Sequence, residues 1–461
     1  MSGQVFWAPQ AWLDGRWQAE VLMQADARGH WTSFTVGRPA PEGVERLAGP
    51  VLPSLVDAHS HAFQRAFAGL AERRKAGEDD FWSWRDRMYG LALKVTPAQL
   101  RAIAAQLYVE LLKGGYTQVC EFHYLQHRED GSAYPDDELA LSWALADAAD
   151  EAGLGLTMLP VLYAHAGFAQ AALRPDQRRF ATDAAWVWRA AQRLNAAGRP
   201  LLNAGVALHS LRAAHAPDIR ALQALVGETA LPIHIHISEQ LQEVRDSLAA
   251  TGRRPMQYLC DEFAPDARWH LVHATHSEPA EIAAVARAGA GVVICPGTEA
   301  NLGDGLADLP GWLGAGVPLS LGSDSHVTRG WIEELRWLEY GQRLGLRQRN
   351  VAADPRGGQP SSAARLFEAS LAGSAAPAGL TSWGLAPGAR ADFLVLDTRA
   401  SGLLGVPQPA LLDALVFASQ GQALRDVYVA GRVRLRQGRH AGEEAIADRF
   451  AAVMAELSTG A

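Results

Sequence analysis

Two pairs of histidines in this 461-residue chain are each separated by one residue: His59 and His61, and His234 and His236. In an extended chain, alternate side chains point to the same face, so both members of a pair can reach one ion. The apolar run VLPSLVDA before the first pair predicts a buried strand, which favours a metal site over two surface histidines. In the second pair we expect His236, nearer the end of its strand, to face the site and His234 to be a hydrogen-bonded core residue.

Asp324, in the segment SLGSDSH, would complete a ligand set with these histidines. Three histidines and one aspartate suit zinc or a similar divalent ion and leave one position for water. The alternative for Asp324 is a helix N-cap, a position at which aspartate is favoured. The metal ligands predicted in this way are His59, His61, His236 and Asp324.

Two further residues could move protons beside such an ion. Glu239 follows His236 by three residues, although a carboxylate here would also stabilise the N-terminus of the next helix. His273 ends another apolar run, and a neutral imidazole can donate or accept a proton near physiological pH. The other interpretations of His273 are a fourth histidine ligand and simple packing.

The candidate residues follow apolar runs that alternate with helical patterns along the chain. Continuous apolar strands between helices indicate parallel strands covered on both sides. Eight such runs predict a (β/α)₈ barrel of the TIM type, larger than the usual ~250 residues, with its chemistry at the C-terminal ends of the strands. A doubly wound open sheet is the alternative, although no GxGxxG or GxxxxGK[ST] motif follows any run. The runs are residues 51–58, 117–122, 156–163, 203–209, 232–238, 269–274, 291–296 and 318–323.

The two ends of the chain predict a second, smaller unit. Residues 1–49 have the pattern of short strands and turns, and ADFLVLD and VYVAGRVRL near the other end are strand-like as well. Neither end has a helical period long enough to form its own core. We therefore predict an α/β protein in which a small β domain of residues 1–49 and 376–461 accompanies a barrel of residues 50–375.

Composition narrows the function further. Lysine and arginine number 42 against 50 acidic residues, a net charge of −8 without a basic run, which argues against a nucleic-acid partner. No run approaches ~18 apolar residues, so no membrane span is expected, and the N-terminus lacks the pattern of a signal peptide. Cys120, Cys260 and Cys295 form neither a disulfide framework nor a zinc-knuckle spacing. These features predict a cytoplasmic protein.

Several short motifs together resemble the metal-dependent amidohydrolase superfamily: HSH (59–61), HIHISE (234–239), His273 and SD (323–324). The segment GLAPGARADFLVLD (384–397) resembles that superfamily's usual return into its β domain. The order of the motifs is similar to the deaminase branch, which carries one catalytic metal, whereas other branches bridge two metals with a carboxylated lysine on strand four. No lysine follows Lys113 in this chain, so the resemblance implies a single divalent ion, most simply zinc.

Longer segments resemble the formimidoylglutamate deiminase family of that superfamily: VDAHSHAFQRAFAG, DDFWSWRDRMY, CEFHYLQH, ALHSLRA, HIHISEQ and LGSDSHV. This resemblance implies hydrolysis of N-formimino-L-glutamate to N-formyl-L-glutamate and ammonia in histidine degradation, and it is compatible with a homodimer. The implied substrate contacts are Gln64, Arg85, Tyr124, His209 and Arg212. The implied catalytic residues are Asp324, which takes a proton from water, His273, which orients that water, and Glu239, which passes a proton to the leaving nitrogen.

Alternatives remain for several of these residues. Arg85 and Arg212 could bind a glutamate-like tail bidentately, or they could be solvated surface arginines. The segment FWSWRDRMY permits either a lid over the site or an ordinary packed helix. A purine or pterin deaminase would share the metal ligands but should prefer aromatic stacking to paired arginines. A metal-binding or structural protein on an inactive barrel is a different class of function, which the intact His273, Glu239 and Asp324 disfavour.

Overall fold

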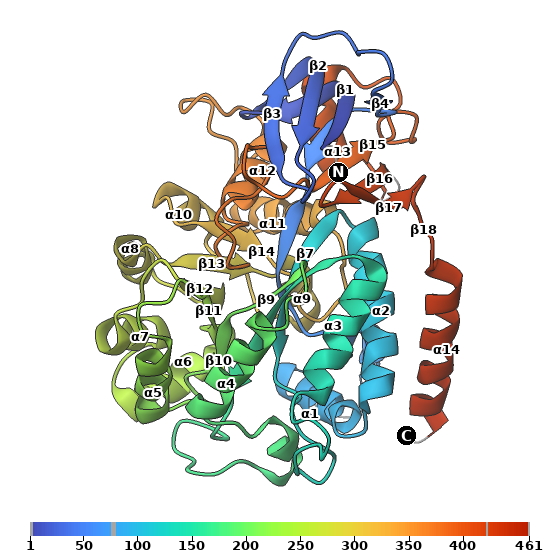
Figure 1. Cartoon of the computed structure of the whole chain (residues 1–461). Coiled ribbons are helices and arrows are strands. Elements are labelled where there is room, and N and C mark those ends of the chain that lie inside the picture. Colours follow the sequence, from blue (N-terminus) through green and yellow to red (C-terminus); the bar gives the residue numbers. More distant parts are fainter. Residues whose placement is uncertain (1–2, 75–79, 421–422, 460–461) are drawn as a thin grey trace.

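Eight parallel strands close into a barrel at the centre of the computed structural model, which describes residues 3–74, 80–420 and 423–459 (Figure 1). Pairing of Leu321 with Asp57, and of Val161 with Ala207, closes the ring. The barrel strands are β6 (Leu55–Ser60), β7 (Tyr116–His123), β8 (Gly155–Leu162), β10 (Val206–Ser210), β11 (Ile233–Ile237), β12 (Trp269–His273), β13 (Gly291–Ile294) and β14 (Leu319–Leu321). The predicted barrel is therefore confirmed, and the open sheet was the wrong alternative.

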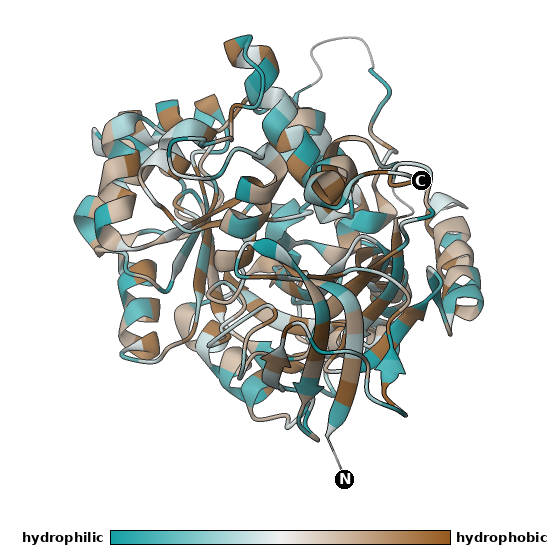
Figure 2. Cartoon of the chain, turned by 90° about the horizontal axis from the view of Figure 1, so that it is seen from above, coloured by the Kyte–Doolittle hydropathy of each residue, from teal (hydrophilic) through white to brown (hydrophobic). Residues whose placement is uncertain are grey.

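The apolar composition of the predicted runs explains why they form the barrel. Their residues are buried on both faces of the strands, and Figure 2 shows apolar residues concentrated on the strands while the surrounding helices alternate in colour. Two runs differ from the prediction. Residues 51–58 divide into β5 (Val51–Pro53) and β6, and residues 203–209 divide into β9 (Leu202–Ala204) and β10. The first division arises because β5 pairs with the strands of a second sheet.

Helices cover the outside of the barrel, and side chains at their first turns define where they start. α2 (Pro97–Lys113) begins after Thr96, whose hydroxyl accepts the N–H of Gln99, and α1 (Phe81–Ala92) begins after Asp80, which accepts the N–H groups of Trp82 and Ser83. The segment FWSWRDRMY is thus helical. The other helices around the barrel are α3 (Ala140–Ala152), α4 (Ala184–Asn195), α5 (Ala216–Val226), α6 (Leu241–Thr251), α7 (Pro255–Phe263), α8 (Pro279–Ala288), α9 (Pro296–Leu302), α10 (Leu309–Gly314), α11 (Trp331–Leu346) and α12 (Ser362–Ala372).

Both ends of the chain contribute strands to a second sheet, as the sequence predicts. Phe6, Trp31, Phe393 and Tyr428 pack edge-to-face or stacked in its core. The exact division of the chain into domains stays a prediction. The strands of this sheet are β1 (Gln4–Leu13), β2 (Arg16–Ala25), β3 (Trp31–Thr35), β4 (Glu45–Arg46), β5, β15 (Phe393–Leu396), β16 (Leu424–Val429), β17 (Arg432–Arg436) and β18 (Arg439–His440).

The C-terminal segment also contains helices that the sequence analysis did not anticipate. α13 (Leu411–Phe417) packs on α12, and α14 (Glu443–Thr459) runs beside α2 of the barrel (Figure 1). Ile446 and Val453 of α14 are buried in the main hydrophobic core, and the Arg65 guanidinium lies over the Phe450 ring at 4.9 Å. The end of the chain is therefore part of the barrel's packing as well as of the second sheet.

Among the described residues, no helix has both the length and the apolar character that crossing a membrane would require. Cys120, Cys260 and Cys295 are all free thiols, as their spacing predicts.

Arg390 joins the second sheet to the N-terminal end of the barrel. Its guanidinium donates to Oε1 of Gln118 at 2.9 Å and to the carbonyl of Thr117 at 3.1 Å, both in β7. The same guanidinium is paired at 2.7 Å with Asp392, which is 1% exposed. Since a buried carboxylate is stable only when its charge is compensated, the joint depends on this pair.

We predict that Arg390→Ala lowers the free energy of unfolding by about 3–5 kcal/mol, because it leaves the Asp392 carboxylate buried and unpaired. Urea denaturation followed by circular dichroism measures the change. The control is Arg439→Ala, which breaks an exposed pair with Glu444 and should change stability little. Equal effects of the two substitutions would contradict the importance of the joint.

Candidate active site

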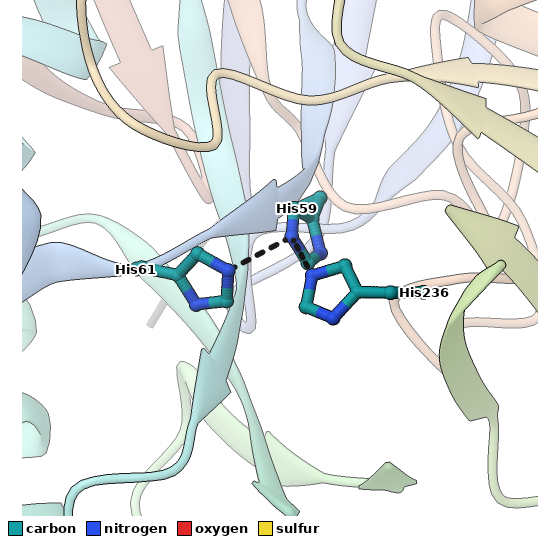
Figure 3. A group of neighbouring side chains, drawn as sticks. All are labelled: His59, His61 and His236. Atoms are coloured by element: carbon teal, nitrogen blue, oxygen red, sulfur yellow. Dashed lines mark hydrogen bonds between the residues drawn. The ribbon is translucent and has the colours of Figure 1, made fainter. Parts of the chain in front are cut away.

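Three imidazole rings meet at the C-terminal end of the barrel (Figure 3). Nε2 of His59 lies 3.1 Å from Nε2 of His61 and 3.0 Å from Nε2 of His236. All three residues are buried, and they come from β6, the turn after it, and β11. His234 points elsewhere and bonds to the carbonyl of Pro377 at 2.9 Å, which confirms its predicted place in the core.

Backbone carbonyls fix the orientation of two of these rings. Nδ1 of His61 donates to the carbonyl of Phe122 at 2.8 Å, and Nδ1 of His236 donates to that of His209 at 2.8 Å. A carbonyl can only accept, so the lone pairs of both rings are on Nε2 and face the centre of the cluster. Burial lowers the pKa of His59, His61 and His236, which keeps the rings in the neutral form that binds a metal.

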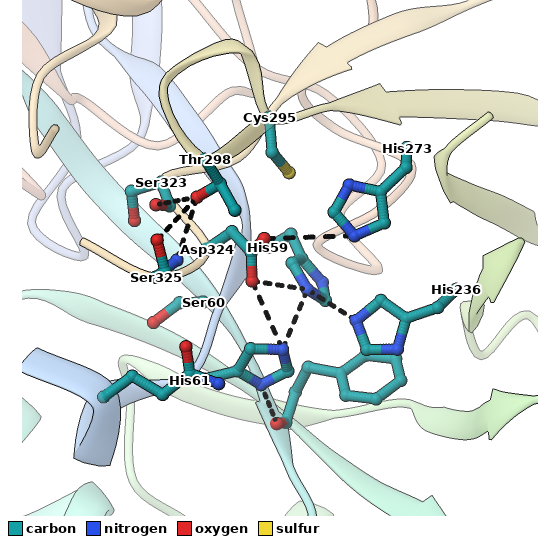
Figure 4. A network of polar contacts seen from close by, with 12 residues as sticks. His59, Ser60, His61, His236, His273, Cys295, Thr298, Ser323, Asp324 and Ser325 are labelled. Atoms are coloured by element: carbon teal, nitrogen blue, oxygen red, sulfur yellow. Dashed lines mark hydrogen bonds and ion pairs between the residues drawn. The ribbon is translucent and has the colours of Figure 1, made fainter. Parts of the chain in front are cut away.

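The carboxylate of Asp324 completes the cluster (Figure 4). Its Oδ1 lies 3.4 Å from Nε2 of both His59 and His61, and its Oδ2 lies 3.9 Å from Nε2 of His273. Asp324 caps no helix, because α11 does not begin until Trp331. The Nε2 atoms of three histidines and a carboxylate are a donor set that fits a divalent cation, and the described residues therefore fit the predicted metal site.

Close contact between two strands is needed to bring Asp324 beside the histidines. A Cβ atom on Gly322 would lie 2.6 Å from Cβ of His59 and 2.8 Å from Sγ of Cys295. Asp324 itself has φ of 50°, and its N–H donates to the carbonyl of His59 at 2.9 Å. A non-glycine residue in the left-handed region is held there by its surroundings, as is common at functional sites.

His273 and Glu239 lie on the open side of this cluster. Nε2 of His273 is 3.8 Å from Oε1 of Glu239, and both side chains are buried. Burial raises the pKa of Glu239 to about 7. Burial opposes protonation of His273, but the carboxylates of Glu239, Glu299 and Asp324 outweigh it and raise the pKa of His273 to about 10. These carboxylates thus favour the imidazolium over the neutral ring that the sequence suggested.

Two buried carboxylates that the sequence analysis missed support the backbone of the ligands. Asp57 accepts the N–H of Ser323 at 2.8 Å and its hydroxyl at 2.5 Å, next to Asp324. Glu121 accepts the hydroxyl of Ser60 and the N–H of residue 62, each at 2.7 Å. Burial raises their pKa values to about 7 and about 8. The available signal was an acidic residue inside each apolar run.

A cavity opens directly above the cluster, and every predicted substrate-contacting residue lines it. Gln64 donates to the hydroxyl of Tyr124 at 3.0 Å along one wall. His165, although it also follows a strand end, is paired with Asp218 and does not line the cavity. The lining residues are His61, Gln64, Phe81, Trp84, Arg85, Met88, Tyr89, Tyr124, His209, Arg212, His236, Glu239, His273, Leu302 and Asp324.

Both arginines of the cavity are in contact with one aromatic ring. The guanidinium carbons of Arg85 and Arg212 lie 4.6 Å and 5.3 Å from the ring centroid of Trp82. Within the described part of the chain, neither Nε atom has a hydrogen-bond partner. Their guanidinium groups are therefore wall groups of the cavity, and α1, which carries Trp82, forms part of that wall.

Comparison with known proteins agrees with this geometry. The model of the amidohydrolase family matches residues 51–434. The chain belongs to the amidohydrolase family. This amidohydrolase is 47% identical to a formimidoylglutamate deiminase of Pseudomonas aeruginosa over 98% of each chain.

Comparison of the fold with solved structures agrees with this family. An amidohydrolase from Brucella melitensis superposes with a TM-score of 0.92 at 40% identity, covering 98% of this chain and 99% of its own. An adenosine deaminase from Xanthomonas campestris, solved with bound zinc, has a TM-score of 0.81 at 20% identity over 99% of each chain and so shares the fold.

We predict that Gly322→Ala destabilises this amidohydrolase by about 1–3 kcal/mol, because the added methyl group would collide with the side chains of His59 and Cys295. It should also weaken metal retention, since it displaces a predicted ligand. Thermal unfolding and metal content after dialysis measure both effects. Gly314→Ala, where an added Cβ meets nothing within 4 Å, is the control. Unchanged stability and metal content in Gly322→Ala would contradict the packing argument.

Proposed function

We propose that this amidohydrolase hydrolyses N-formimino-L-glutamate to N-formyl-L-glutamate and ammonia, a step of histidine degradation in the cytoplasm. The observation that carries the proposal is a cavity with a metal-binding cluster at its base and two arginines, Arg85 and Arg212, in its wall. The metal-binding cluster suits hydrolysis at a carbon–nitrogen bond, and the two arginines suit a substrate with two carboxylates. The 47% identity to a formimidoylglutamate deiminase supports the same conclusion.

The predicted cofactor is one zinc ion, held by His59, His61, His236 and Asp324. When bound, such an ion would lower the pKa of a water molecule to about 7 and so supply hydroxide at neutral pH. The chain's own contribution is to keep three imidazole rings neutral and to place the side chain of Asp324 beside them.

Three side chains carry out the proton transfers and the charge stabilisation that the proposed reaction needs. Asp324 accepts the proton of the attacking water through Oδ2, the oxygen that faces His273. His273 donates through Nε2 and stabilises negative charge at the attacked carbon. Glu239 passes a proton to the departing nitrogen, a role that suits a carboxyl group whose pKa is raised to about 7. The C–N bond then breaks, and nitrogen leaves as ammonia.

Specificity would come from the other end of the cavity. Arg85 and Arg212 would each bind a carboxylate of the glutamate tail, and the Trp82 ring, which both guanidinium groups contact, would help to position them. Gln64, Tyr124 and His209 would contact the substrate between tail and metal. The described ion pairs of Arg85 include only a 3.5 Å contact with the exposed Asp86, so its guanidinium has donors free for a ligand.

Ammonia release from a panel of substrates tests the proposal. Zinc-loaded protein should act on N-formimino-L-glutamate with a kcat/KM roughly 10³-fold or more above that for guanine, adenosine or a pterin, because partly buried arginines without a carboxylate partner disfavour neutral ligands. A preference for a purine or pterin would replace the proposal with that of an aromatic deaminase.

For the metal, we predict about one tightly held zinc ion per chain, because the three histidine Nε2 atoms and the Asp324 carboxylate meet in one place. Metal analysis after gel filtration gives the stoichiometry, and removal by a chelator should abolish activity that one equivalent of zinc restores. A requirement for two ions per chain would contradict this.

For proton transfer, we predict that His273→Asn lowers kcat roughly 10²–10⁴-fold while zinc content is retained, because His273 lies outside the predicted ligand set. The half-exposed His30, in the second sheet, provides the control variant His30→Asn, which should behave as the parent. Loss of zinc in His273→Asn would mean that His273 is itself a ligand.

For the tail, we predict that Arg212→Ala raises KM for N-formimino-L-glutamate strongly, since losing one partner of a buried charge pair costs about 2–5 kcal/mol. A formimino compound without carboxylates should be a poor substrate that responds little to the substitution. Arg220→Ala, which removes an exposed arginine of α5, serves as the control. If Arg212→Ala harmed both substrates equally, Arg212 would be a structural residue.

A further inference from the structure

Glu299 is a buried carboxylate that has no role in the reaction derived above. It lies in the first turn of α9, directly after β13, and its side chain is 5% exposed. Its Oε1 is 3.4 Å from Nδ1 of His273 and accepts the backbone N–H of Cys295 at 3.0 Å. Because that N–H anchors the carboxylate, Glu299 meets His273 in one defined position.

The two nitrogens of His273 face different partners. Nδ1 faces Glu299, whereas Nε2 faces Asp324 at 3.9 Å and Glu239 at 3.8 Å (Figure 4 shows the Asp324 contact). A carboxylate accepts hydrogen bonds, so Nδ1 of His273 carries a hydrogen and donates a hydrogen bond to Glu299. The nitrogen directed at the cavity is therefore Nε2.

Packing alone does not select this orientation of the ring. The second side-chain torsion of histidine is broad and roughly two-fold, so a rotation of about 180° would exchange the nitrogen and carbon edges of the ring. His273 also has φ of 71°, an uncommon backbone conformation for a bulky residue, at the end of β12. An acceptor on the Nδ1 side distinguishes the two orientations energetically.

A second metal site is the competing explanation for this group. One ligand atom from each of His273, Cys295 and Glu299 lies within 4.8 Å of the others. However, this group offers three protein ligand atoms, whereas a closed structural zinc site has four. Glu299 Oε1 is also already occupied by the Cys295 N–H.

We propose that Glu299 is a positioning residue that acts through His273: its carboxylate holds the Nδ1–H and thereby aims Nε2 into the cavity beside Asp324 and Glu239. This inference rests on the proposed function for the role of His273. Carboxylates that orient an active-site imidazole in this way are a recurrent device in enzymes.

A double-mutant cycle on the full-length, zinc-loaded protein tests whether Glu299 acts through His273. With N-formimino-L-glutamate, Glu299→Ala should lower kcat roughly 10–100-fold and leave KM nearly unchanged. In the His273→Asn background the same substitution should cost less than about threefold, because the residue it positions is gone. Losses that multiply independently in the double variant would overturn the proposal.

Two further variants separate positioning from the alternatives. Glu299→Gln keeps the shape and an acceptor for the Nδ1–H, so it should recover part of the kcat that Glu299→Ala loses. Cys295→Ala keeps the contact between Glu299 and His273, so kcat and zinc content should match the parent. If Cys295→Ala removed a second metal ion together with activity, the group would be a metal site and the proposal would fail.

Proton NMR provides a readout that needs no turnover. The hydrogen-bonded Nδ1–H of His273 should give a downfield resonance, assigned by its loss in His273→Asn. We expect it to vanish in Glu299→Ala and to persist in Cys295→Ala, and an unchanged resonance in Glu299→Ala would overturn the proposal. If the parent released no ammonia from N-formimino-L-glutamate, the proposed function would fail, while this resonance would still decide the role of Glu299.

Discussion

Imidazole nitrogens whose lone pairs are directed at one point repel each other unless a cation or a proton lies between them. His59, His61 and His236 are held close together in a buried cluster at the base of the cavity, with Nε2 of His59 3.1 Å from that of His61 and 3.0 Å from that of His236. The carbonyls of Phe122 and His209 prevent two of the rings from turning their lone pairs away. The barrel around the cluster therefore holds a donor set that suits a cation in a fixed arrangement.

Close contacts between strands and locally strained backbone hold the cluster in place. Asp324 and His273 both have positive φ at the ends of their strands, and Gly322 lets β14 approach β6 closely enough for Asp324 to reach the histidines. In the proposed function, substrate selection depends instead on Arg85 of α1, a helix between the first barrel strand and α2, and on Arg212, which follows β10. The proposal thus assigns the chemistry to one group of residues and recognition of the glutamate tail to another.

Much of this was accessible from the sequence because it depends on local pattern. The barrel follows from eight apolar runs, and the predicted ligands follow from HxH spacing at the ends of those runs. What the sequence did not reveal depends on contacts between distant segments: Trp82 against Arg212, Glu299 against His273, and α14 along α2. No periodicity encodes which side of the His273 imidazole will be approached by Glu299, a carboxylate of the helix that follows the next strand.

The most direct test of the whole account is the anomalous scattering map of zinc-loaded crystals grown with the product N-formyl-L-glutamate. The account predicts one zinc peak among His59, His61, His236 and Asp324, with the formyl group next to it and the two product carboxylates on Arg85 and Arg212. Carboxylates bound away from both arginines, or a zinc peak outside the histidine cluster, would contradict it.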